Sequence, residues 1–343
     1  MGGAGWAAAN PAPAPVDRRE VATGAGVSSA AVLRTDPWVW EGLQGRVMHS
    51  RSFSIYTTET DPMIIGRMPG FLDAGIEHYI TAITPLPRPT SRLETFVMGD
   101  RGQWQRLTLA MLGEQGRTLT YIERGGFAYG GRSFLFDIGA ADTLAIAVHE
   151  GWHQYTQRTF RDRLPSWAEE GLATLMEGHR WTGNDVVFLP WSNLERFDRL
   201  RDAAGKRTLL PLETVLTANP QALMQKGFDA PVTWYAQLWA LMHFLREGAG
   251  GKYRPALDRL VADAAAGRMG RAMAIQLDDP RASSLLAQRS GLQVFRAYFA
   301  RDLGPFEAEY RAFITAVIGP GGRNAVVDGR APAAATSNHN RAP

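Results

Sequence analysis

The pattern of hydrophobic and polar residues changes character near residue 139. Before this point, short segments rich in β-branched and aromatic residues predict strands, and one longer segment with apolar residues at helical spacing predicts a helix. The expected strands are 47–58, 93–98, 119–123 and 132–138, and the expected helix is 61–83. A glycine-bracketed segment between the last two strands, GGFAYGG at 125–131, is expected to form a hairpin or a bulge.

After residue 139 the apolar residues follow helical spacing. Helices are expected at 140–160, 166–177, 232–248, 253–266 and 292–317. Strands followed by helices predict an α+β fold. The two ends, 1–35 and 319–343, are rich in Gly, Pro and Ala and lack periodicity, so we expect them to be disordered. One domain remains, 36–318, with a β-rich part, 36–139, and a helical part, 140–318.

Composition and charge narrow the function classes. Of the 343 residues, 45% are hydrophobic and 21% are charged, as in soluble globular proteins. The net charge of +3 argues against a nucleic-acid binder, and no apolar run approaches the ~18 residues needed to span a bilayer. Cysteine is absent, so any metal must be bound by His, Asp or Glu. The Pro/Ala-rich start lacks signal-peptide features but resembles the linker that follows a removed signal, which favours export to the periplasm or the cell exterior.

The sequence HEGWH, residues 149–153, is an H-E-x-x-H motif inside an expected helix. Residues four apart lie on the same helix face, so the imidazoles of His149 and His153 can reach one ion. Glu150 is placed beside that ion, where it can accept a proton from water. The alternative interpretation is a solvated helix face that carries His and Glu without a metal.

A catalytic zinc ion needs three protein ligands, and the segment LPSWAEEG, 164–171, supplies two glutamates. Ser166 is expected to cap the second helix, with Glu169 at the N3 position of a capping box and bonded to the Ser166 amide. Glu170 is rotated by about 100° from Glu169 and is free to face the first helix. We therefore expect Glu170 to be the third ligand and Glu169 to be structural.

Other residues remain alternatives. Asp162 in the connecting loop is a possible third ligand, and His179 is expected instead to cap the end of the second helix. Glu177 lies two turns beyond Glu170 and is either a partner of the centre or a surface charge. Gly151 costs about 1 kcal/mol relative to Ala in a helix, which hints at the close approach of another backbone.

The segments HEGWHQY, 149–155, and LPSWAEEGLATLMEG, 164–178, resemble the gluzincin metallopeptidases, whose zinc ligands follow the pattern H-E-x-x-H…E. The closest likeness is to bacterial predicted metallopeptidases of unknown substrate with a peptidase-MA-like domain, and it spans roughly 46–265. The resemblance implies a zincin-like, thermolysin-like fold, with a small mixed sheet above a helical part. It also implies one Zn²⁺ per chain on His149, His153 and Glu170, and hydrolysis of a peptide or protein substrate.

The same resemblance implies roles for residues outside the two motifs. In the segment WYAQLWAL, 234–241, Tyr235 is the candidate donor to the oxyanion, with a core aromatic as the alternative role and His243 as the alternative donor. The edge strand of such folds pairs with substrate, and here it is expected at 133–138, with 126–131.

The sequence also departs from the family pattern. Thr174 replaces an acidic partner of a ligand histidine, so we expect Glu177 or a backbone carbonyl to orient that ring. The G-x-M-E-N exopeptidase motif is absent, so recognition of a free amino terminus is not supported.

Two functions from other classes remain. One is a catalytically inactive zincin-like binding protein. The presence of Glu150 argues against this function, because a binding protein needs no general base. The other is a helical binding protein in which both motifs arose by chance.

Overall fold

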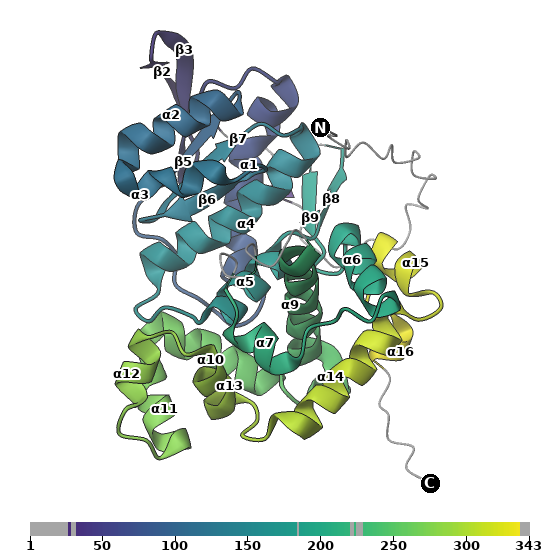
Figure 1. The fold of residues 1–343 in the computed structure, drawn as a ribbon. Helices are drawn as coiled ribbons and strands as arrows, with labels where there is room; N and C mark the ends of the chain where they lie inside the picture. Colours follow the sequence, from purple (N-terminus) through teal and green to yellow (C-terminus); the bar gives the residue numbers. More distant parts are fainter. Residues whose placement is uncertain (1–26, 29–31, 184, 220–222, 224–228, 337–343) are drawn as a thin grey trace, which may run out of the picture.

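The computed structural model describes residues 27–28, 32–183, 185–219, 223 and 229–336 (Figure 1). Its upper part is built around a six-stranded mixed sheet with the order β2-β3-β4-β5-β7-β6. The central strands β4, β5 and β7 are parallel, and the other neighbours are antiparallel. The strands are β2 (Arg34–Trp40), β3 (Leu43–His49), β4 (Phe53–Thr57), β5 (Leu93–Met98), β6 (Gly126–Tyr129) and β7 (Arg132–Phe136).

Helices cover both faces of this sheet, as side-chain alternation along the strands requires. Leu93 and Val97 of β5 face α1 (Pro62–Tyr79) and α4 (Ala140–Thr159), and belong to the main hydrophobic core. Phe96 lies on the opposite face and belongs to a smaller core with Trp104 of α2 (Arg101–Leu112). In Figure 1, α4 runs beneath the sheet towards the helical lower part of the molecule.

The lower part is a helical assembly that packs against α4 through α5 (Ser166–Met176), with α9 (Asp229–Glu247) behind α5. A small sheet with the order β1-β9-β8 lies beside it. Its strands are β1 (Val27–Ser28), β8 (His179–Thr182) and β9 (Asp185–Phe188). The remaining helices are α3 (Glu114–Arg117), η1 (Leu119–Tyr121), α6 (Leu194–Gly205), α7 (Leu212–Thr217), η2 (Gly248–Gly251), α10 (Arg254–Ala266), α11 (Met269–Leu277), α12 (Ala282–Ala287), α13 (Gly291–Tyr298), α14 (Leu303–Ile318), α15 (Gly322–Val327) and α16 (Ala333–Thr336).

The expected mixture of a β-rich part followed by helices is confirmed, and so are most of the individual elements. The strand at 93–98 and the helices at 140–160, 166–177, 232–248 and 253–266 agree with β5, α4, α5, α9 and α10 to within a few residues. The glycine-bracketed hairpin is also present, because Gly130 and Gly131 adopt positive φ angles in the two-residue turn between β6 and β7.

Three expectations about secondary structure were wrong. The strand at 47–58 is two antiparallel strands, because the chain reverses at 50–52, where Asp73 accepts hydrogen bonds from the Ser50 hydroxyl and the Ser52 amide. The segment 119–123 contains the 3₁₀ helix η1, and the helix at 292–317 is divided into α13 and α14, with Asp302 capping α14. The sequence reading also missed α2.

The ends of the chain are more ordered than the composition suggested. Within the segment 1–35, β1 pairs with β9 and β2 begins at Arg34. Within 319–343, α15 and α16 are helical, and Val326 is fully buried. The rest of the expected disorder, 1–26, 29–31 and 337–343, lies outside the described residues. Among the described helices, none combines the length and the apolar character that crossing a bilayer requires.

Candidate metal centre

Helix α4 brings the two histidines of the motif together. Its buried face, which includes Val148, Trp152 and Tyr155, packs into the main core and fixes the rotation of the helix. His149 and His153 lie one turn apart and are each 8% exposed, and their Nε2 atoms are 3.2 Å apart. The two imidazoles thus direct the same nitrogen towards one point.

Helix α5 adds Glu170 to this point. The Oε2 atom of Glu170 lies 3.4 Å from the Nε2 atom of each histidine. The helix is anchored by Trp167, whose indole donates to the Gly291 carbonyl, and by Gly171, where a Cβ would overlap Met242 of α9. Within the described part of the chain, these three residues form the one group of His, Asp or Glu side chains that could share an ion.

Glu177, the residue that caps the end of α5, orients His149. The Oε1 atom of Glu177 lies 2.8 Å from Nδ1 of His149, which makes Nδ1 the donor and directs Nε2 towards Glu170. Thr174, at the position of the missing acidic residue, instead donates to the Gly171 carbonyl of its own helix. Of the two groups expected to orient a histidine of the motif, Glu177 or a backbone carbonyl, the structure shows Glu177 on His149.

Glu177 is itself held by residues at the start of α6. Asn193 donates to its Oε2 atom at 2.6 Å, and Arg196 donates to both oxygens, at 2.8 and 3.1 Å. Burial raises the pKa of Glu177, but Arg196 and His149 outweigh this effect and lower the pKa to about 2. The carboxylate is therefore an ionised acceptor for the His149 ring.

His153 has an equivalent partner, and here the sequence-based assignment was wrong. Glu169 was expected to bond to the Ser166 amide, but its Oε1 atom lies 3.0 Å from Nδ1 of His153 and accepts from Thr156 at 2.6 Å. The helix begins one residue earlier than expected, with Pro165 at the N-cap and no side-chain cap. Glu169 is therefore the fourth helical residue, where a capping box cannot form.

The charges around the centre favour a cation. Burial lowers the pKa of His149, but the carboxylates of Glu170 and Glu177 outweigh it and raise this pKa to about 9. For Glu170, burial opposes ionisation, yet the two histidines hold its pKa well below its usual range. Positive charge is therefore stabilised between these side chains, whether it is carried by protons or by a metal ion.

Glu150 lies on α4 beside the two histidines and faces β6. Burial raises the pKa of Glu150 above its ordinary value, although both histidines and the backbone amide of Ala128 act in the opposite direction. A carboxylate with a raised pKa is a stronger base, which suits a group that must take up and release a proton near neutral pH.

Tyr235 approaches the centre from α9. Its ring lies edge-on to His149 at 6.2 Å between centroids, and the Arg196 guanidinium lies 5.1 Å from the ring centre. Burial, followed by the Glu170 carboxylate, raises the pKa of Tyr235 well above its ordinary value. The phenol therefore remains a neutral hydrogen-bond donor next to the candidate ligands.

The alternative residues are engaged elsewhere. Asp162 accepts from the Met269 amide at 2.9 Å, and His179 donates through Nδ1 to the Glu177 carbonyl at the end of α5, as expected for a cap. His243 is fully buried and stacks on Trp191 at 3.6 Å between centroids. None of the three belongs to the group that includes Glu170.

The residue that approaches Gly151 is a side chain, whereas we had expected backbone. A Cβ on Gly151 would lie 2.7 Å from the hydroxyl oxygen of Tyr79, which donates to the Val148 carbonyl at 2.6 Å. Because this bond joins α1 to α4 directly before the motif, glycine at position 151 is required by the packing of the two helices.

The edge of the sheet beside the centre is β6. The segment 133–138, which we expect to be the edge strand, lies largely in β7, between β5 and β6. That part of the expectation is wrong, and only the part that places 126–131 at the edge is correct. Gln157 of α4 donates to the Ala128 carbonyl at 3.3 Å and accepts from the Gly131 amide at 2.9 Å. These bonds hold the β6–β7 hairpin against the helix that carries the histidines.

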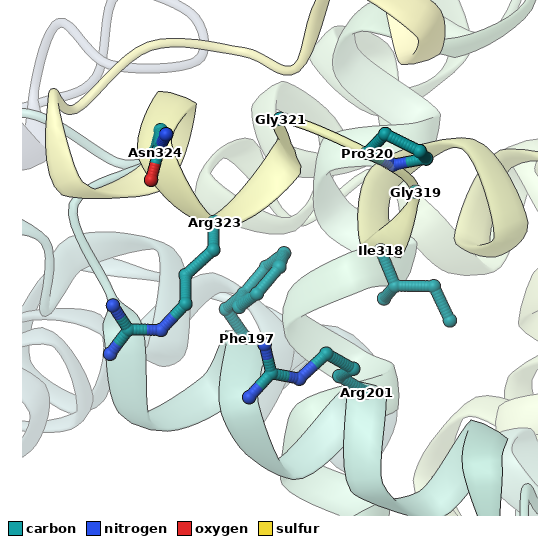
Figure 2. Close-up of a pocket in the computed structure, with 8 residues that line it drawn as sticks. All are labelled: Phe197, Arg201, Ile318, Gly319, Pro320, Gly321, Arg323 and Asn324. Atoms are coloured by element: carbon teal, nitrogen blue, oxygen red, sulfur yellow. The ribbon is translucent and has the colours of Figure 1, made fainter.

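Two pockets occur away from the three candidate ligands. One, of about 440 Å³, lies between α6 and the segment 318–324, as Figure 2 shows, and none of the predicted site residues lines it. The other, of about 420 Å³, lies at the turn of the β6–β7 hairpin.

Comparison of the chain with protein-family models and with curated proteins gives no match. The interpretation of the centre therefore depends on its own residues and their geometry.

Proposed function

We propose that this chain is a zinc-dependent peptidase with a zincin-like fold, in which His149, His153 and Glu170 bind the ion. The observation that carries the proposal is the spacing of the three ligand atoms. Zinc bonds to N and O ligands of about 2.0–2.2 Å in tetrahedral geometry require ligand atoms about 3.3–3.6 Å apart. The separations here are 3.2, 3.4 and 3.4 Å.

The surroundings of the ligands support the same proposal. Each histidine is hydrogen-bonded through Nδ1 to a glutamate, as metal-binding histidines commonly are. Two imidazoles and one carboxylate form a donor set known from catalytic zinc sites. The edge strand β6 beside α4 and the helical part below are consistent with a zincin-like arrangement.

A bound zinc ion would activate water and polarise the carbonyl of the scissile peptide bond. In the proposed reaction, Glu150 accepts a proton from the water whose oxygen attacks the carbonyl carbon. The carbon–nitrogen bond then breaks, and Glu150 passes the proton to the leaving amine. Tyr235, whose ring contacts His149, would donate a hydrogen bond to the substrate oxygen on which negative charge develops.

Strand β6 offers a place for an extended substrate. Ala128 pairs with Ser133 at a position where its amide and carbonyl point away from β7, towards Glu150 and Gln157 of α4. A peptide that exchanges these contacts for its own backbone hydrogen bonds would pass directly beside the proposed base.

Substitution of the base tests the proposal. Glu150→Gln keeps the shape of the side chain but removes its basicity, so the variant is expected to bind zinc as the wild type does. Peptide hydrolysis should fall by about 10²–10⁴-fold, the usual contribution of a general base. Asp162→Asn, in the loop between α4 and α5, is the matched control and is expected to retain activity. Zinc binding without hydrolysis by the wild type would favour an inactive zincin-like binding protein instead.

A further inference from the structure

The pocket at the β6–β7 turn carries an excess of positive charge. It is lined by Arg92, Glu94, Gly130, Gly131, Arg132 and Arg158. Arg132 pairs with Glu94 at 2.6 Å, which neutralises both groups. Through its Nε atom, Arg92 donates to the carbonyl of Ser50 but has no acidic partner in the described residues. Two guanidinium groups therefore face solvent here without a counter-charge.

Arg158 differs from Arg92 in that its guanidinium has no partner among the described residues. Among the described residues it has neither an ion pair nor a hydrogen bond, and its side chain packs over Gly131. A Cβ on Gly131 would overlap the Arg158 side chain, so glycine is needed both for this contact and for the positive φ of the turn. The aliphatic part of Arg158 is thus held in place while its guanidinium remains available.

The pocket and the proposed zinc centre share two elements. Arg158 follows His153 by five residues on α4, which corresponds to about 7.5 Å along the helix axis. The hairpin that forms one wall of the pocket also places Ala128 beside Glu150. A chain that lies along β6 past Glu150 is therefore led towards the pocket.

The direction of a bound strand determines which part of it reaches the arginines. Antiparallel strand pairs are more frequent than parallel ones. A peptide antiparallel to β6 would have its N-terminal side near Gly131 and its C-terminal side near Gly126. With about 3.4 Å per residue, the pocket lies roughly three residues N-terminal to the peptide residue that pairs with Ala128.

We propose that this pocket binds acidic side chains of the substrate on the N-terminal side of the scissile bond, an inference that rests on the proposed peptidase function. Guanidinium groups bind carboxylates through paired, charge-assisted hydrogen bonds. In the pocket of Figure 2, by contrast, both arginines, Arg201 and Arg323, already pair with the carboxylate of Asp198.

Binding and cleavage are measured separately. Peptide binding is measured with the full chain carrying Glu150→Gln. Three fluorescent peptides of equal length are used. The first has glutamates in its N-terminal half, the second has glutamates in its C-terminal half, and the third has glutamines throughout. The arginines are then replaced by Gln at positions 92 and 158, and the matched control is Arg271→Gln, an exposed arginine of α11 that lines neither pocket. Cleavage uses the wild-type chain and a mixture of peptides whose cut sites are identified by mass spectrometry.

The peptide with N-terminal glutamates is expected to bind most tightly. Each arginine replacement should weaken the binding of this peptide by about threefold, and this effect should be smaller at high salt. The Arg158→Glu variant leaves the pocket with two positive and two negative side chains, so it should lose the preference for N-terminal glutamates, with unchanged thermal unfolding. Equal binding of all three peptides would overturn the inference, as would cleavage without acidic preference. Preference for C-terminal glutamates would refute the antiparallel placement. Charge-selective binding without any cleavage would contradict the peptidase function and leave the pocket assignment intact.

Discussion

The replacement of Glu177 by glutamine tests how the centre is organised. Four donor groups converge on the two oxygens of Glu177: Nδ1 of His149, Nδ2 of Asn193, and two nitrogens of Arg196. An amide keeps the shape of the carboxylate but replaces one acceptor oxygen by a donor. Whichever way the amide is turned, its NH₂ group faces two other donors, so the network cannot be satisfied.

The size of the effect follows from this geometry. Loss of the hydrogen-bond partner of a metal-binding histidine costs about 10–100-fold in metal affinity, or about 1.4–2.7 kcal/mol. The Glu177→Gln change also leaves the Arg196 guanidinium without its counter-charge in a largely buried position. We therefore expect a loss near 100-fold in zinc affinity and, in the metal-free protein, a lower free energy of unfolding.

The assay is a zinc titration in competition with a chromophoric chelator, at a temperature well below the unfolding of the metal-free variant. Glu309→Gln serves as the matched control, because Glu309 is also paired with a cation, Lys252, but lies in the helical part away from the centre. The control should bind zinc like the wild type. Zinc affinity of Glu177→Gln equal to that of the wild type would refute the reasoning.

Three further predictions follow from contacts around α1 and α4. Burial lowers the pKa of His78 from 6.5 to about 3, so the free energy of unfolding falls as the pH falls from about 6.5 towards 3. In urea unfolding at pH 5, the free energy of unfolding of His78→Phe should exceed that of the wild type by up to about 2 kcal/mol. At pH 8 this gain should be absent. Gly151→Ala should lower stability by about 1–3 kcal/mol, and less when combined with Tyr79→Phe, in a double-mutant thermal unfolding cycle; additive losses would contradict the contact. Thr156→Val removes the hydroxyl donor to Glu169 and should weaken zinc binding by about threefold to tenfold in the same competition titration.

The two helices of the centre could be predicted because their information is local. The spacing of His149 and His153 places them on one face of any helix, and the strong apolar periodicity of 140–160 predicts that helix. The rotation between Glu169 and Glu170 is likewise a property of the helix alone. What the sequence reading misjudged was the start of α5, and one residue was enough to change the partner of Glu169.

The contacts that hold the candidate ligands in position could not be predicted, because they come from tertiary packing. Asn193 and Arg196 meet Glu177 only once α6 is placed beside α5, and no short motif links these residues. Tyr79 contacts Gly151 from α1, about seventy residues away in sequence. In the same way, the short helix α15 near the C-terminus depends on the burial of residues such as Val326 rather than on a periodic pattern.

The central claim is that one zinc ion is bound by His149, His153 and Glu170, and metal analysis of the purified protein tests it most directly. Elemental mass spectrometry should find about one zinc per chain in the wild type and in Asp162→Ala, and little in His149→Ala or Glu170→Ala. Retention of zinc by Glu170→Ala would contradict the proposed third ligand. Absence of bound metal in the wild type after zinc has been supplied would contradict the account as a whole.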